Sequence, residues 1–173
     1  IYDCIEQDNA RYWLGSFNGE LSVLGKRVVT DANQSCFLLK TTKTGVFEWL
    51  QTLDAGGTVS SLKMTLDSTG KVLLAGSYSG SFSYRGNLIF EVAEKDRVFL
   101  CAFSSEGELD ASNILEAETK EKLVGLEVIS DGSMLLLCQG FGSNTLGANN
   151  PEGTSTSTES SALMELSSGR LIK

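Results

Sequence analysis

Three segments of this chain repeat one pattern at a spacing of about 62 residues, which is long enough for a complete supersecondary unit. The letters YWLGSFNG at Tyr12–Gly19 recur as LLAGSYSG at Leu73–Gly80, and more weakly as LLLCQGFG at Leu135–Gly142. A repeat of this kind indicates a unit that buries its apolar face only against a neighbouring copy. The repeat therefore constrains the fold more strongly than any local motif.

Turn residues keep the same register along the chain. Gly45, Gly107 and Gly169 each follow an apolar segment, and they succeed one another at equal intervals. The segment Met64–Gly70 matches Leu126–Gly132 at that same interval. Because independent landmarks agree, we treat the chain as three copies of one unit.

Each unit is predicted to contain four short antiparallel strands. Apolar runs are interrupted by Gly, Asn, Asp or Ser about every 8 to 12 residues, which is the pattern of an all-β fold. In the second copy the strands are expected near Ser61–Leu66, Lys71–Ser77, Val98–Phe103 and Glu108–Ser112. A small extra hairpin is expected around Arg85–Asn87, and Glu116–Val124 is interpreted as a polar loop. No helix is predicted.

Four antiparallel strands per repeat are typical of a β-propeller blade. The sequence thus predicts one propeller segment, with blade 1 at about 1–52, blade 2 at about 60–112 and blade 3 at about 122–173. Propellers close with typically four to eight blades, so three blades leave open edges. We expect further blades from a longer chain, another subunit or a second copy. Ile1 lies in a predicted strand without an initiator Met, which favours an excised piece of a longer protein.

Two motifs recur within the repeat. Gly-Ser-aromatic-x-Gly-x-apolar-Ser occurs at Gly15–Ser22 and Gly76–Ser83, and Asp67–Gly76 reads DSTGKVLLAG. With the apolar Phe-Leu strands, these motifs resemble the bacterial β-propeller repeat often called the SBBP repeat, found in secreted and surface proteins. The resemblance covers essentially the whole chain, although in the third unit Cys138 replaces the glycine and Asn144–Ser161 is a polar insert, of which the Ser/Thr-rich stretch Gly153–Ser161 is interpreted as a flexible loop. It implies a propeller fold and an extracellular, cell-surface or periplasmic location, and no particular activity.

Composition argues against several classes of function. The chain has 22 acidic and 14 basic residues, a net charge of −8 and no Lys/Arg cluster, so nucleic acid would be repelled. It has no apolar run of about 18 residues, which predicts no transmembrane span. The absence of His removes His-based acid–base catalysis and His-containing metal sites. We therefore predict no catalytic, metal-binding or cofactor-binding residues, and no cofactor.

The four cysteines are interpreted as small buried hydrophobic residues on separate strands. Cys4, Cys36, Cys101 and Cys138 are far apart in the sequence, so they lack the paired spacing of a zinc site. One disulfide among them is the alternative in an exported protein, with a connectivity that sequence does not reveal.

Two aromatic side chains are the candidates for contact with a ligand or partner. Trp49, with its neighbour Phe47, lies in the outer strand of the first unit and is not repeated in the other units. Trp13 is instead expected in the core. The acidic residues from Glu106 to Glu121 are interpreted as a solvated loop face, with docking of a basic partner as the alternative.

These inferences combine into one functional hypothesis. We expect a non-catalytic, exported β-propeller scaffold or binding module whose partner is protein or polysaccharide. Two alternatives stay open: a fragment of a glycan-active propeller enzyme, and a structural subunit of a cell-surface assembly. Carboxylates on the inner strands would favour the enzyme, whereas open edges that invite strand addition would favour the assembly.

Overall fold

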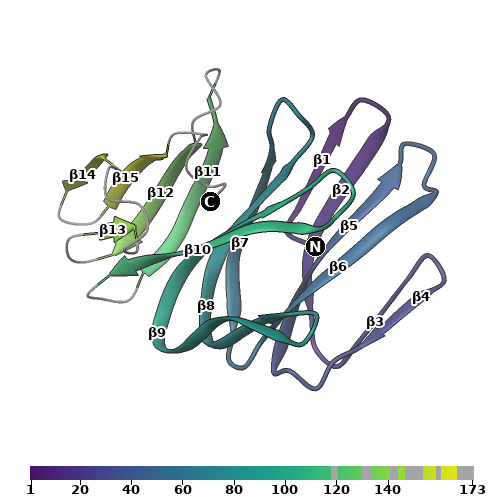
Figure 1. The fold of residues 1–173 in the computed structure, drawn as a ribbon, viewed down its shortest axis with the longest axis horizontal. Coiled ribbons are helices and arrows are strands. Elements are labelled where there is room, and N and C mark those ends of the chain that lie inside the picture. The colour runs from purple at the N-terminus through teal and green to yellow at the C-terminus, as the bar shows by residue number, and fades with distance from the viewer. Residues whose placement is uncertain (118–120, 130–133, 141–143, 147–153, 159–160, 167–173) are drawn as a thin grey trace.

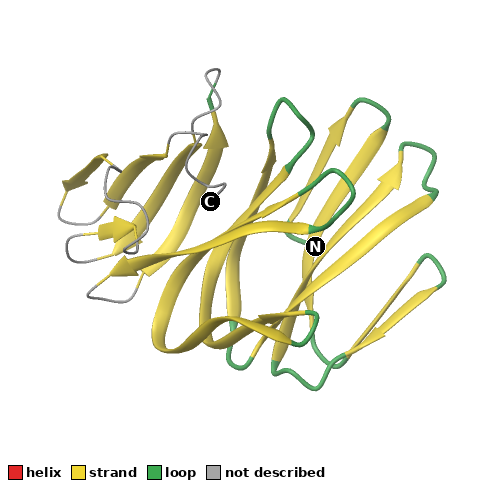
Figure 2. Cartoon of the chain, in the orientation of Figure 1, coloured by secondary structure: helices red, strands yellow, loops and turns green. Residues whose placement is uncertain are grey.

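The structure is a computed structural model that describes residues 1–117, 121–129, 134–140, 144–146, 154–158 and 161–166. Within these residues the secondary structure is entirely β, and every strand ladder is antiparallel (Figures 1 and 2). The all-β prediction is therefore confirmed. None of the described segments forms a helix long and apolar enough to cross a membrane.

Fifteen strands make up the described chain. They are β1 Asp3–Gln7, β2 Ala10–Phe17, β3 Glu20–Val23, β4 Lys26–Val29, β5 Gln34–Thr42, β6 Phe47–Ala55, β7 Val59–Leu66, β8 Val72–Tyr84, β9 Asn87–Phe103, β10 Leu109–Ala117, β11 Glu121–Val128, β12 Met134–Gly140, β13 Asn144–Leu146, β14 Thr154–Thr158 and β15 Ser161–Leu166.

The first unit consists of β1, β2, β5 and β6, paired in that order. The short hairpin β3–β4 branches off between β2 and β5 and forms a sheet of its own. β2 is apolar on both sides because Tyr12 and Leu14 face one side, whereas Trp13 and Phe17 face the other. A strand with two apolar faces has to be covered on both sides.

The second unit consists of β7, β8, β9 and β10, again paired in chain order. β8 and β9 are long, and their outer ends form the predicted extra hairpin, which turns at Arg85–Gly86. This outer part of β8 also pairs with β6, through Leu53 opposite Tyr84 and Ala55 opposite Phe82. The two units therefore share one continuous sheet (Figure 1).

The third group of strands pairs in the order β11, β12, β15 and β14. Two sequence-based expectations are wrong here. Thr154–Thr158, predicted as part of a flexible loop, forms β14, and the predicted loop Glu116–Val124 contributes Glu116–Ala117 to β10 and Glu121–Val124 to β11. Thr favours strands although it is polar, and in both places the backbone pairs with a neighbouring strand, through β14–β15 and β11–β12.

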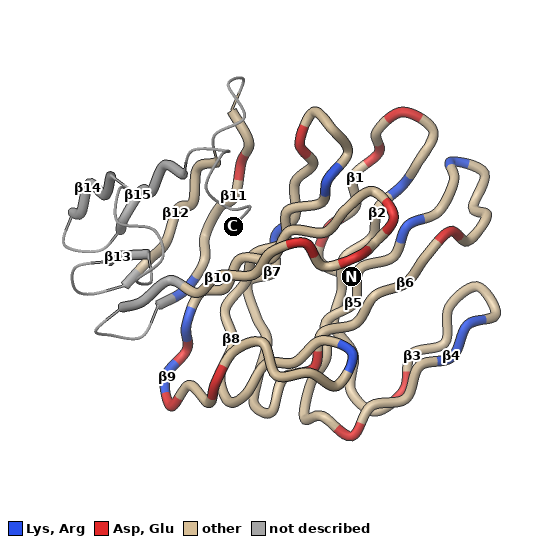
Figure 3. Tube along the Cα trace, viewed as in Figure 1, with Lys and Arg blue, Asp and Glu red and all other residues tan. Residues whose placement is uncertain are grey.

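Three apolar clusters follow from the two-sided strands. The first lies between the first and second units, and the second lies between the second unit and β11–β12. The third covers the other side of the first unit. Charged residues lie mainly at hairpins and strand ends (Figure 3). The described strands do not close into a ring of sheets.

Candidate functional site

The first unit presents an apolar surface on the side away from the second unit. We call this surface the front face. Its residues are Trp13, Phe17, Leu21, Val23, Val28, Phe37, Leu39, Phe47 and Leu50. They come from β2, β5, β6 and the hairpin β3–β4. Only Phe17, Phe37 and Leu39 among them are buried, so the front face is covered in part.

A cavity of about 270 Å³ opens on the front face. It is lined by Ile1, Arg11, Trp13, Val23, Leu24, Phe37, Leu39, Thr41 and Gly45. Its two main polar groups already have partners, since Arg11 binds Glu6 at 2.7 Å and Trp13 Nε1–H donates to Thr41 Oγ1 at 3.4 Å. The cavity can therefore accept an apolar group and offers little to a polar one.

The hairpin β3–β4 forms one wall of this cavity. Its turn residues Leu24 and Gly25 both have positive φ, 48° and 74°, as a two-residue type I′ turn requires. Leucine is disfavoured in this conformation, by about 1–2 kcal/mol. Leu24 nevertheless stands here with 52% of its surface exposed. An apolar side chain is thus held outward at a strained position beside the cavity.

The outer edge of β3 has unpaired backbone groups. Val23 and Lys26 flank the two-residue turn and are the hydrogen-bonded pair, so the next pair, Ser22 and Arg27, is not bonded across the hairpin. Ser22 N–H and C=O therefore point away from β4. Among the described strands, β4 is the sole partner of β3. This edge can take a further strand.

Gly15 allows the ring of Phe37 to lie flat across β2. A methyl group at Gly15 would stand 2.5 Å from Phe37 Cε1. Gly76 and Phe99, the equivalent residues of the second unit, repeat this arrangement, with Phe99 Cε1 at 2.8 Å from the same methyl position. Phe99, however, is fully buried between the first and second units, whereas Phe37 borders the cavity.

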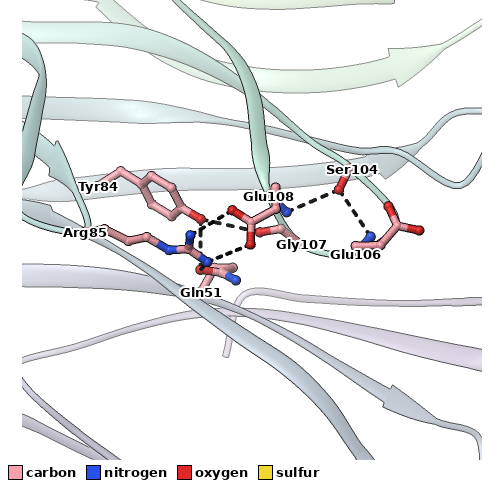
Figure 4. A network of polar contacts seen from close by, with 7 residues as sticks. All are labelled: Gln51, Tyr84, Arg85, Ser104, Glu106, Gly107 and Glu108. Carbon is pink, nitrogen blue, oxygen red and sulfur yellow. Dashed lines mark hydrogen bonds and ion pairs between the residues drawn. The ribbon is translucent and has the colours of Figure 1, made fainter.

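A polar network joins the first and second units at the β9–β10 turn (Figure 4). The Tyr84 hydroxyl donates to Gln51 Oε1 at 3.0 Å, and Arg85 binds both carboxylate oxygens of Glu108 at 2.7 and 2.9 Å. Burial raises the pKa of Tyr84, and the Glu108 carboxylate raises the pKa of Arg85. Because these groups satisfy one another, the network links the units and holds no reactive group.

The acidic residues of this region bind groups of their own chain. Glu108 pairs with Arg85, and Asp110 lies 3.0 Å from Lys71 Nζ. The Ser105 hydroxyl donates to Glu106 and lowers its pKa. The side chains of 115–121 lie outside the described part, so docking of a basic partner stays an untested alternative.

Trp49 packs inside the junction between the units. Its Nε1–H donates to the Ser105 carbonyl at 3.0 Å, its ring lies over Gly107, and Tyr12 meets it edge-on with centroids 6.1 Å apart. Lys40 donates to the same carbonyl at 3.2 Å. These contacts give Trp49 a role within the fold, and its predicted contact with a partner stays a prediction.

Phe47, the second predicted contact residue, lies on the front face. It is half-buried, and Lys26 Nζ stands 4.9 Å from its ring centroid. The structure therefore separates Phe47 from Trp49, because Trp49 belongs to the junction between the units. Only Phe47 shares a surface with the cavity.

None of the four cysteines forms a disulfide. Cys36, Cys101 and Cys138 are buried, as expected of small hydrophobic residues, whereas Cys4 is exposed. Burial raises the pKa of Cys36 to about 12 and places the pKa of Cys101 well above its usual range. These two buried thiols are therefore poor nucleophiles and metal ligands at neutral pH.

The described residues contain no cluster of acidic or cysteine side chains that could hold a metal ion. The geometry thus offers an apolar cavity and an open strand edge, and the residues that line the cavity include no arrangement for acid–base or nucleophilic chemistry. Comparison with protein-family models, curated proteins and solved structures finds no match for this chain.

Sequence reasoning missed most of the front face. The sequence predicts Trp13 in the core and assigns no role to Val23 or Leu24. The structure places all three residues in the lining of the cavity. The signal that could have found them is the repeat register. Trp13 and Phe37 correspond to Leu74 and Phe99, which lie at the junction with the first unit.

Proposed function

We propose that the chain is a segment of a β-propeller of the SBBP-repeat type and acts as an exported, non-catalytic scaffold that binds protein through its front face. The observation that carries this proposal is the front face itself, where an apolar cavity adjoins the unpaired edge of β3. Apolar surface and free backbone groups together favour an extended peptide segment as ligand.

The strand order supports the propeller part of the proposal. Within the continuous sheet, β1-β2-β5-β6 and β7-β8-β9-β10 are each four antiparallel strands paired in chain order, which is the strand order of a propeller blade. The shared motif, Gly15–Ser22 and Gly76–Ser83, runs from the second strand of each unit into its extra hairpin. The exported location rests on the family resemblance alone.

The alternatives receive different support. Polysaccharide would need hydrogen-bonding side chains beside an aromatic surface, and the cavity lining is almost wholly apolar. A glycan-active enzyme would need a pair of carboxylates, and none lines the cavity. A structural subunit of a cell-surface assembly is the second candidate, favoured by the unpaired edge of β3.

Binding of the uncharged fluorescent dye phenylnaphthylamine tests whether the front face accepts apolar ligands. Leu24→Asp places a charge at the cavity and suits the left-handed turn better than Leu, so folding should be unaffected. Leu88→Asp is the control, because Leu88 is 59% exposed and lies outside the cavity. We expect Leu24→Asp to weaken binding about tenfold and Leu88→Asp to leave it unchanged. Absent dye binding by a monomeric chain, or equal loss in both variants, would refute the binding role of the front face.

A further inference from the structure

We propose that the occupant of the front face is a further four-stranded unit of this same repeat, and that its fourth strand pairs with β3. This inference rests on the proposed role of the front face as a docking surface, and it names the partner. It follows from the junction between the first and second units. There the surface of the second unit that is equivalent to the front face is covered by the first unit, and we call it the occupied surface.

The apolar residues of the occupied surface correspond to those of the front face. Leu74 and Phe99 of the second unit are buried against the first unit. Their equivalents in the repeat register are Trp13 and Phe37 of the front face. In the second unit Leu62 also covers Gly76, at 2.7 Å from the position of a methyl group there. The register equivalent of Leu62 is Ile1, whose Cα lies 3.3 Å from the methyl position at Gly15. The two units therefore differ at Trp13, which is only half-buried, and at Phe37, which is buried but borders the cavity.

The strand pairing corresponds residue by residue. In the occupied junction, Leu53–Ala55 of β6 pairs with Phe82–Tyr84 of β8, and Gly56 N–H donates to the Ser81 carbonyl at 2.8 Å. In the repeat register the equivalent of Phe82–Tyr84 is Leu21–Val23, which lies in β3. β3 is thus the strand that should receive the fourth strand of another unit.

The two hairpins also have the same geometry. Leu24 and Gly25 have φ of 48° and 74°, and their equivalents Arg85 and Gly86 have φ of 50° and 76°. Each turn therefore places the same backbone groups outward. In the second unit these groups belong to Ser83, which pairs with β6, and in the first unit they belong to Ser22.

The chemistry of the front face determines which kind of partner can cover it. The occupant has to offer an unpaired strand edge together with an adjoining apolar stripe, as β6 and the Tyr12–Leu14 side of β2 do for the second unit. A helix has no free backbone groups for β3, and a sugar cannot fill an apolar cavity of about 270 Å³ favourably. A sheet unit of this repeat satisfies both requirements.

The test adds a further copy of residues 1–61 directly before Ile1, so that the copy precedes the first unit in the register in which the first unit precedes the second. The added copy carries Leu24→Asp, which gives its hairpin peptide a distinct mass. Hydrogen exchange then reports on the original β3, and phenylnaphthylamine reports on the original cavity. We expect the Ser22 amide to exchange more slowly by about tenfold or more, and the dye to be excluded.

Two variants of the original hairpin provide a matched pair. Ser22→Pro removes the N–H at the outer edge of β3, where the further unit would pair. Arg27→Pro removes the corresponding N–H at the outer edge of β4, on the opposite side of the hairpin. In the unextended chain both should bind the dye as the parent does. In the extended chain Ser22→Pro should restore dye binding, and Arg27→Pro should leave the dye excluded.

The outcomes separate this inference from the proposed function. If the extended chain binds the dye as the parent does and Ser22 exchange is unchanged, this inference is overturned while the docking role of the front face stands. If the parent chain instead forms a dimer that Leu24→Asp dissociates but Ser22→Pro leaves intact, measured by light scattering, a second copy covers the front face without pairing to β3, and the inference is overturned as well. A monomeric parent that binds no dye would refute both proposals.

Discussion

Gly107 and Gly45 provide a direct measure of how strongly Trp49 holds the first two units together. They occupy equivalent turns of the repeat and have nearly identical φ, +86° and +85°. A methyl group at Gly45 would meet no atom within 4 Å, but one at Gly107 would stand 2.8 Å from Trp49 Cδ2. Alanine at either position thus incurs the same backbone strain, and only at Gly107 does it also meet Trp49.

The expected costs follow from these contacts. Backbone strain alone should make Gly45→Ala cost about 1–2 kcal/mol of unfolding free energy. Gly107→Ala should cost about 1–3 kcal/mol more, the usual penalty of overpacking. Displacement of Trp49 accounts for this difference, since it would break its hydrogen bond to Ser105 and its edge contact with Tyr12, worth about 1 kcal/mol each.

Urea denaturation followed by circular dichroism measures both variants and their parent. Trp49→Leu supplies the internal control, because a smaller side chain leaves room for the methyl group. In that background Gly107→Ala should cost no more than Gly45→Ala does. Equal costs for the two glycine variants in the parent chain would show that Trp49 moves freely, and would refute the role assigned to it.

Three further predictions concern packing and the thiols. Gly76→Ala should lower the free energy of unfolding, measured by urea denaturation, by about 1–3 kcal/mol. Gly15→Ala should lower it by less than about 1 kcal/mol, because Phe37 can shift into the cavity. A larger loss for Gly15→Ala than for Gly76→Ala would contradict this packing. Ellman's reagent should modify one thiol, Cys4, quickly in the native chain and all four in urea; fast reaction of a second native thiol would be inconsistent with the burial found. Raising the pH from 8 to 10 should lower the unfolding free energy by about 1.4 kcal/mol through Cys36, whose folded pKa of about 12 lies above 9.0, so that its thiol ionises first in the unfolded chain. Cys36→Ala should remove that part of the loss, and an unchanged pH dependence in the variant would disprove its origin.

The repeat register allowed the strands of the second unit to be predicted, but not how far they extend. The predicted strands Lys71–Ser77 and Val98–Phe103 largely coincide with parts of β8 and β9. In the structure β8 continues to Tyr84, and β9 already begins at Asn87. That extension depends on pairing with β6, a contact between distant residues that local propensity does not encode.

The candidate site shows the same division between local and long-range information. Trp49 stands out in the sequence because no other unit repeats it, and the structure packs it against the turn at Ser105–Gly107, a contact between distant residues. Trp13 was assigned to the core because apolar residues fill its equivalent positions. Periodicity identifies an apolar side of a strand, but whether another element covers that side depends on the neighbours in space.

The ladder between β6 and β8 changes the size of the cooperative folding unit. In a linear array each repeat usually adds its own stability and one interface term, so terminal repeats can fray separately. Here Leu53–Ala55 is hydrogen-bonded to the second unit, and unfolding of the first unit would leave Phe82 and Tyr84 without their cover. The first two units should therefore melt in a single transition, and the smallest autonomous fragment of such an array is a pair of repeats.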